Sequence, residues 1–358
     1  MVDPPLSSVP AGEPAAPEVT RADTSMSAWF VARVDTLLRL GLLGIILIAA
    51  VIFTIRTIPS GSLADIGQST FLSVGNLQDL ARQMAVVGVI SIGETFVIIT
   101  AGIDLSVGAV IGIAGILTAL EFLDSWPTPF VIITVLLFSL AVGLTNGFLV
   151  SVGKIPPFIV TLGMMGILRG MAYLVGNGLS QALSPSGETI PFTTWVEGTF
   201  LGIPTIFLVF VAIGVVAGAF LRFTRHGRYI YAQGSNPEGA RRAGINVRAT
   251  ILTVYAISGV LAGVAALLLT GRLGSANPNN GLGNELDAIA AAVLGGASLF
   301  GARGTVVGTF LGVVLVNMLA NGIDLINIDP HVQQVVEGML LIAIVWIDQW
   351  RKRRIVAA

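Results

Sequence analysis

Polar side chains that could do chemistry occur inside stretches of the chain that are otherwise apolar: Glu94, Asp104, Asn146, Arg169 and Asn317. An ionisable group costs about 2.5–3.5 kcal/mol at the centre of a membrane helix, so such groups are expected to face protein or water. Three chemistries fit. Glu94 and Asp104 could relay a proton, or Arg169 could pair with a carboxylate among inter-helix hydrogen bonds. Alternatively, Glu94, Asn146 and Asn317 could line the route of a polar solute. These residue types favour inter-helix bonding over pathway lining, and pathway lining over proton coupling.

Asp104 lies in the segment AGIDLSVGA, between two apolar runs. Gly102 breaks the first run, and Asp104 directly precedes the second. This arrangement predicts a helix N-cap, in which the carboxylate accepts the free amides of Ser106 or Val107 and meets the positive end of the helix dipole. We therefore expect Asp104 to shape a turn at or near the cytoplasmic membrane surface.

A second set of residues, SNPEGARRAG at 235–244, predicts a short helix with both ends marked. Ser235 or Asn236 can cap it, Pro237 suits the first helical position, and Glu238 favours the positive end. Basic residues at 241 and 242 suit the negative end, and Gly244 can take the left-handed turn that closes a helix. Two helical turns are not stable alone in water, so a partner surface is implied. Anionic lipid would explain the arginines, but not a capped helix containing Glu238, Ala240 and Gly244.

The elements that position these residues are predicted to be membrane helices. The sequence is 54% hydrophobic and only 11% charged, and apolar runs of about 20 residues recur along it. An all-α polytopic membrane protein of about ten transmembrane helices is expected, with one or two of them short or re-entrant. The expected spans are 37–55, 80–99, 105–122, 129–150, 157–175, 202–222, 249–270, 285–300, 304–320 and 334–349.

Basic residues give the orientation, because they favour cytoplasmic loops. Ten of the 19 lie between the sixth and seventh spans or in the C-terminal tail: Arg222, Arg225, Arg228, Arg241, Arg242, Arg248, Arg351, Lys352, Arg353 and Arg354. Both segments and both termini are then cytoplasmic. We expect a disordered, proline-rich tail at 1–30, a transmembrane domain at 31–350 and a basic tail at 351–358.

Loops 176–201 and 271–284 are then predicted to be external. The longer one mixes turn-forming residues with apolar and aromatic ones. A solvated linker and a docking surface for an external partner explain it equally well.

The sequence lacks the usual components of catalytic or metal sites. It has no cysteine and only two histidines, which are far apart in the chain and have no ligand-spaced partner. It contains no phosphate-binding loop of the G-x-x-x-x-G-K-[ST] type. We therefore expect no enzymatic activity, no metal and no cofactor in this chain.

The residues Glu238-Gly239-Ala240, followed after three residues by Gly244, resemble the coupling motif of ATP-binding-cassette importer permeases, with Gly239 where alanine is usual. Four segments resemble the ribose/xylose/galactose-type sugar permeases, and the similarity runs from about residue 37 to 350. These segments are AGIDLSVGA, IPPFIVTLGMMGILRGMAYLVGNG, GRYIYAQGSNPEGARRAGI and LGGASLFGARGTVVGTFLG.

This resemblance implies a permease subunit in a bacterial inner membrane. Two permease copies, as a homodimer, would work with two cytoplasmic ATPase subunits that hold ATP and Mg²⁺, and an extracytoplasmic binding protein would deliver a monosaccharide or polyol. The coupling helix would comprise Asn236, Pro237, Glu238, Ala240 and Gly244. A permease for branched-chain amino acids or another small solute is the main alternative. An ion-coupled secondary transporter and a membrane-embedded enzyme or scaffold are others.

Overall fold

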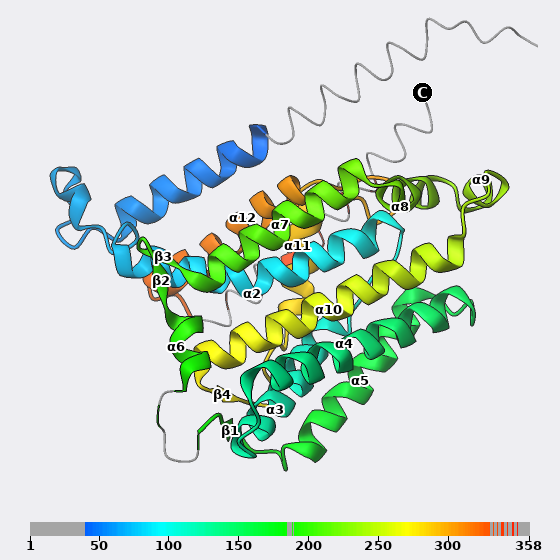
Figure 1. Ribbon diagram of the computed structural model, residues 1–358. Coiled ribbons are helices and arrows are strands. Elements are labelled where there is room, and N and C mark those ends of the chain that lie inside the picture. Colours follow the sequence, from blue (N-terminus) through cyan, green and yellow to red (C-terminus); the bar gives the residue numbers. More distant parts are fainter. Residues whose placement is uncertain are drawn as a thin grey trace, which may run out of the picture. The chain divides into compact units, whose positions relative to one another are not determined.

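The computed structural model describes residues 40–184, 188 and 190–329, together with positions 332, 335, 338, 339, 342, 346 and 349. These residues are mostly helical, and the strands are four two-residue segments (Figure 1). The predicted tails at 1–30 and 351–358, and most of the predicted span at 334–349, lie outside the described residues.

Helices and strands follow one another along the chain with short connections. An apolar helix at Leu40–Arg56 comes first. It is followed by η1 (Leu63–Gln68), α2 (Val74–Ile99), α3 (Val107–Leu123), α4 (Thr128–Ser151), α5 (Pro157–Val175), β1 (Gln181–Ala182), α6 (Pro191–Glu197), β2 (Thr199–Phe200), β3 (Ile203–Pro204), α7 (Thr205–Phe223), α8 (Arg225–Ser235), α9 (Pro237–Arg242), α10 (Val247–Leu273), β4 (Ser275–Ala276), α11 (Asn284–Leu294) and α12 (Val306–Leu325).

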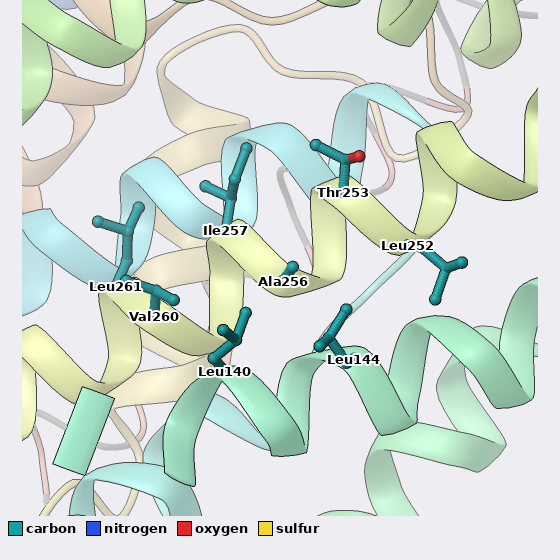
Figure 2. Close-up of a pocket in the computed structure, with 8 residues that line it drawn as sticks. All are labelled: Leu140, Leu144, Leu252, Thr253, Ala256, Ile257, Val260 and Leu261. Carbon is teal, nitrogen blue, oxygen red and sulfur yellow. The ribbon is translucent and has the colours of Figure 1, made fainter. Parts of the chain in front are cut away.

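Helix α10 lies at the centre and packs against α2, α3 and α4. Its contact with α4 is close because small residues face each other there. A Cβ at Gly259 would lie 2.9 Å from the Cα of Gly143, so the two helix backbones touch at this point. A groove of 390 Å³ opens beside this contact (Figure 2). Its lining is apolar except for Thr253, so it lacks the polar groups that would orient a sugar.

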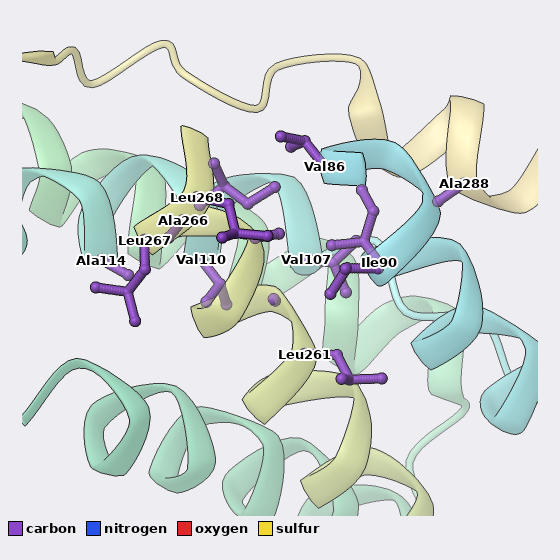
Figure 3. Close-up of a cluster of buried hydrophobic side chains, with 14 of the residues drawn as sticks. Val86, Ile90, Val107, Val110, Ala114, Leu261, Ala266, Leu267, Leu268 and Ala288 are labelled. Atoms are coloured by element: carbon purple, nitrogen blue, oxygen red, sulfur yellow. The ribbon is translucent and has the colours of Figure 1, made fainter. Parts of the chain in front are cut away.

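The main core joins α2, α3, α10 and α11. Figure 3 shows side chains from all four helices meeting: Val86, Ile90, Val107, Val110, Ala114, Leu261, Ala266, Leu267, Leu268 and Ala288. From Met84 to Ile99, helix α2 is buried throughout and apolar apart from Ser91, Glu94 and Thr95, as expected of a helix enclosed by others. Of its most apolar 18-residue stretch, 89% is buried. The corresponding share is 28% in α4 and 22% in α5.

Nine of the ten predicted spans coincide with helices among the described residues. Six of these helices are long and apolar enough to cross a membrane by length and composition, and Leu40–Arg56 and α3 are shorter apolar helices. Helix α2 begins six residues before the predicted position because the Ser73 hydroxyl caps it, accepting the Asn76 amide at 3.2 Å. The span predicted at 285–300 is wrong in length, since α11 ends at Leu294 before two glycines, of which Gly296 has φ +96°.

The segment 275–283, which was predicted to be part of an external loop, packs into the helical body. It runs antiparallel to α3, where glycines make room for it. A Cβ at Gly112 would lie 2.8 Å from the Pro278 carbonyl oxygen, and one at Gly108 would overlap the Gly281 carbonyl. The described part of the other loop, 176–201, is folded into β1, α6 and β2. Strand β1 pairs antiparallel with β4, and α6 packs against α10.

Candidate functional site

Helices α8 and α9 project at the end of the helical body where α7 ends and α10 begins (Figure 1). We call residues 225–242 the α8–α9 arm. The Thr224 hydroxyl caps α8 by accepting the Gly227 amide at 3.0 Å. Helix α8 buries Gly227, Ile230 and Gln233 and packs against α2, α7 and α10. Its other face is polar, so α8 is an amphipathic helix, and it connects α9 to the helical body.

Helix α9 has both of the predicted end structures. Asn236, rather than Ser235, is the cap, and its side-chain oxygen accepts the Gly239 amide at 2.9 Å. Gly244 has φ +83°, and the following amide, of Ile245, donates to the Ala240 carbonyl at 3.0 Å. This closure also buries Ala240, which is 5% exposed.

The charged side chains of α9 pair within the helix. Glu238 lies 3.6 Å from Arg241 and 3.4 Å from Arg242, and all three are well exposed. Exposed pairs of this kind contribute little stability, about 0–1 kcal/mol. These charges are therefore free to exchange partners when another protein surface arrives.

A second polar region, which we call the Asp104 cluster, lies inside the helical body and comprises Glu94, Asp104, Ser106, Asn146, Tyr255 and Ser258. The Asp104 carboxylate accepts from the Ser106 amide at 3.0 Å, the Ser106 hydroxyl at 2.6 Å and the Ser258 hydroxyl at 2.9 Å. The Asn146 amide then donates to the Ser106 hydroxyl at 2.9 Å. Three elements are thus joined through one carboxylate.

These contacts correct two predictions about Asp104. Helix α3 begins at Val107 with Ser106 as its N-cap, so Asp104 is not the cap but forms a turn before it, although its carboxylate does accept the Ser106 amide as predicted. It is also deeper than expected, because Ser258 lies eleven residues into the 27-residue α10, about 16 Å from its start. The turn at Gly102 was predicted correctly: its amide donates to the Val97 carbonyl at 3.0 Å.

Several polar atoms of the cluster lack a well-aligned hydrogen-bond partner. Both carboxylate oxygens of Glu94, the side-chain oxygen of Asn146 and the Tyr255 hydroxyl are buried in this way, with the Asp104 backbone amide near the Glu94 carboxylate. Glu94 is completely buried, and it lies close enough to Asp104 and Glu285 to interact with both electrostatically. The cluster is therefore rich in acceptors, and a hydrogen-bond donor would satisfy it.

Among the described residues Arg169 makes no ion pair within 4 Å, although Glu285 is near enough to interact with it electrostatically. Its guanidinium donates instead to the backbone carbonyls of Pro278 and Asn280, the latter at 3.1 Å. Arg169 therefore holds the inserted segment 275–283 against α5.

Asn317 lies outside the Asp104 cluster, and its amide donates to the Val313 carbonyl of its own helix at 2.9 Å. Sequence reasoning missed Tyr255, Ser258 and Glu285. It also missed the Thr95–Thr309 hydroxyl pair at 2.6 Å and the reciprocal amide pair of Asn76 and Asn321. Glu285, a carboxylate at the start of a predicted span, was the one residue whose position could have signalled burial. No cluster of metal-ligating side chains occurs within the part of the chain that the structure describes.

Comparison with known proteins gives the family. Residues 76–345 match the family model for the permease component of the branched-chain amino acid transport system. The chain belongs to this permease family. It is 38% identical to the ribose import permease protein RbsC of Haemophilus influenzae, over 78% of this chain and 87% of the relative. The RbsC protein of Bacillus subtilis is also 38% identical, over 78% and 86%. The xylose transport system permease protein XylH of Escherichia coli K12 is 34% identical, over 79% and 87%. No solved structure matches the chain.

These findings confirm the predicted resemblance to importer permeases of the ribose and xylose type. Members of this class are transport subunits and not enzymes. Together with the six helices suited to crossing a bilayer, the family membership makes this chain a multi-pass membrane protein.

Proposed function

We propose that this chain forms the membrane pathway of an ATP-driven importer for a monosaccharide or polyol. Two copies would work with two cytoplasmic ATPase subunits, which bind ATP and Mg²⁺, and with an extracytoplasmic binding protein that delivers the solute. The observation that carries the proposal is α9. It is a six-residue helix, capped at both ends and largely exposed, and it occupies the position of the coupling motif.

The proposed orientation has ten spans and both termini in the cytoplasm. The arginines of the arm and its flanks support it, because Arg222, Arg228 and Arg248 lie near the ends of α7 and α10 that meet the arm. The arm is then the surface that the ATPase subunits would contact. Asn236, Pro237, Glu238, Ala240 and Gly244 give it its shape and charge.

Glu94 and Asn146 are the best supported candidates for lining the solute pathway. Both have buried side-chain oxygens without a well-aligned partner, and such oxygens suit the hydroxyl donors of a sugar. Arg169 and Asn317 bind backbone carbonyls and are assigned to structure. Weak polar contact suits a pathway that must release its solute, so most sugar selectivity is assigned to the binding protein.

A branched-chain amino acid is the second candidate substrate, because the description of the matching family names that class. Sugars are favoured because the similar relatives are ribose and xylose permeases. An ion-coupled secondary transporter is the third candidate, supported by the buried acidic pair Glu94 and Asp104.

Uptake into liposomes containing the reconstituted complex separates these functions. We expect accumulation of ribose or xylose that requires ATP and the binding protein. Accumulation of leucine alone would support the second candidate. Uptake that persists without the ATPase and collapses with the proton gradient would support the third.

The assignment of α9 is tested in the same assay with Glu238→Ala and Gly244→Pro. The first removes both ion pairs, and the second removes the residue whose φ of +83° closes the helix. We expect ATP hydrolysis without matching transport, and a membrane domain that remains folded. Normal coupling in both variants would show that α9 is not the coupling helix.

A further inference from the structure

Three segments that are far apart in the sequence meet near the C-terminal end of α8, in the α8–α9 arm. We call this contact, between Gly234 of α8, Ile99 at the end of α2, and Ala302 between α11 and α12, the Gly234 junction. The Ala302 amide donates to the Ile99 carbonyl at 2.9 Å. A Cβ at Gly234 would overlap that carbonyl oxygen and lie 2.7 Å from the Ala302 nitrogen. The three backbones are thus in direct contact.

A neighbouring glycine extends this contact. A Cβ at Gly301 would lie 2.7 Å from the Gly234 carbonyl oxygen and 3.1 Å from the Ala101 Cβ. Contacts between backbones cannot yield by changing a side-chain rotamer, and packed interiors are nearly incompressible. A displacement of α8 toward this surface must therefore move the segments that it touches.

A hydrogen bond ties α8 to the same loop from another side. The Tyr231 hydroxyl donates to the Gly304 carbonyl at 2.7 Å. Burial raises the pKa of Tyr231, so its hydroxyl keeps its proton, and the bond its donor, throughout the neutral pH range. Because of this bond, the loop would follow α8 when α8 moves away from it, as well as when α8 moves toward it.

The segments at the junction lead directly to the buried polar residues. Ile99 ends α2, which carries Glu94, and Asp104 follows five residues later in the turn to α3. On the other side, Ala302 is in the loop that follows α11, whose first turn carries Glu285. Both routes from the junction therefore reach carboxylates that interact with Glu94.

We propose that the Gly234 junction is the rigid link through which displacement of α9 reaches the ends of α2 and α11. The proposal rests on the function proposed above, in which a partner subunit moves α9. It assigns Gly234 and Tyr231 as positioning residues. The competing route is the direct covalent connection from α9 through Gly244 to α10, where the Asn246 side chain caps α10 by accepting the Ala249 amide at 3.0 Å.

The test measures solute transported per ATP hydrolysed by the complete complex. Gly234→Ala forces α8 away from Ile99 and Ala302, and we expect the ratio to fall about tenfold, within the usual range of coupling between sites. Tyr231→Phe removes only the hydroxyl, and we expect a fall of about threefold, just below that range. Subunit assembly and ATP hydrolysis should persist in both.

The matched control is Gly218→Ala in α7, where a Cβ would make only ordinary contact with Val306 at 3.8 Å. We expect its ratio to equal that of the wild type. Asn246→Ala loosens the competing route, and here too the proposal expects a normal ratio. A normal ratio in Gly234→Ala, or a fall confined to Asn246→Ala, would overturn the link.

The readouts separate this proposal from the one on which it rests. If the wild-type complex shows no ATP-dependent uptake, the proposed function fails. If the wild type couples and the junction variants couple equally well, only the link fails. Should Gly234→Ala not assemble, Tyr231→Phe decides, and an unchanged ratio in that variant overturns the link.

Discussion

The α8–α9 arm and the Asp104 cluster are built on opposite principles. In α9, the polar groups are exposed, and each bonds to a residue a few positions away, as Asn236 does to Gly239. In the cluster, the polar groups are buried, and Asp104 bonds to Ser258, 154 residues further along the chain. The arm can therefore change partners at little cost, whereas the cluster holds several helices in register.

Substitution of Asp104 is expected to have the largest effect on stability. Asp104→Leu leaves three buried donors without their acceptor, and each costs about 1–3 kcal/mol, so we expect a loss of at least 3 kcal/mol in stability. Asp104→Asn keeps an oxygen for Ser106 and should be tolerated better. Thermal unfolding of the purified protein in detergent measures both variants. An equal loss in both would indicate that the charge itself matters.

Gly102 is expected to give the next largest effect. A Cβ at this position would lie 2.8 Å from the Tyr255 hydroxyl and 2.9 Å from a methyl group of Val97. Gly102→Ala should destabilise the protein by about 1–3 kcal/mol, as overpacking usually does. Because Tyr255→Phe removes one of the two obstacles, the double variant should recover part of the loss. Strict additivity would show that Gly102 and Tyr255 do not meet in this way.

Substitution of Asn236 tests whether the arm contributes to the stability of the fold. Asn236→Ala removes the cap of α9 and should cost about 1 kcal/mol of local helix stability. Since α9 is exposed, the unfolding temperature of the membrane domain should not change, while the ratio of transport to ATP hydrolysis falls. Asn236→Asp, which keeps the capping oxygen, is the control. A lower unfolding temperature for Asn236→Ala alone would show that the arm supports the fold.

The smallest effect is expected from Arg242. Arg242→Ala removes one exposed ion pair, and its effect on stability should be below about 0.5 kcal/mol. Salt titration of ATPase binding provides the sharper measurement. We expect the variant to bind more weakly at low salt, with the difference shrinking as salt screens the charge.

These differences explain how much could be predicted from sequence. The caps of α9 and the bounds of most helices depend on neighbouring residues, so local patterns were sufficient to find them. The depth of Asp104 depends on where α10 packs, and no local pattern encodes that. The segment 275–283 was correctly predicted as non-helical, but its insertion depends on Arg169, about 110 residues earlier.

That inserted segment has a consequence for how the protein is made. Helix α11 has eleven residues and is about 16 Å long, roughly half the thickness of the hydrocarbon layer. The non-helical stretch before it carries carbonyl groups that lipid could not satisfy, and two of them bond to Arg169 instead. During synthesis, this part of the chain would therefore leave the translocon only once α3 and α5 were in place to receive it. The order of helices along the chain supplies them first.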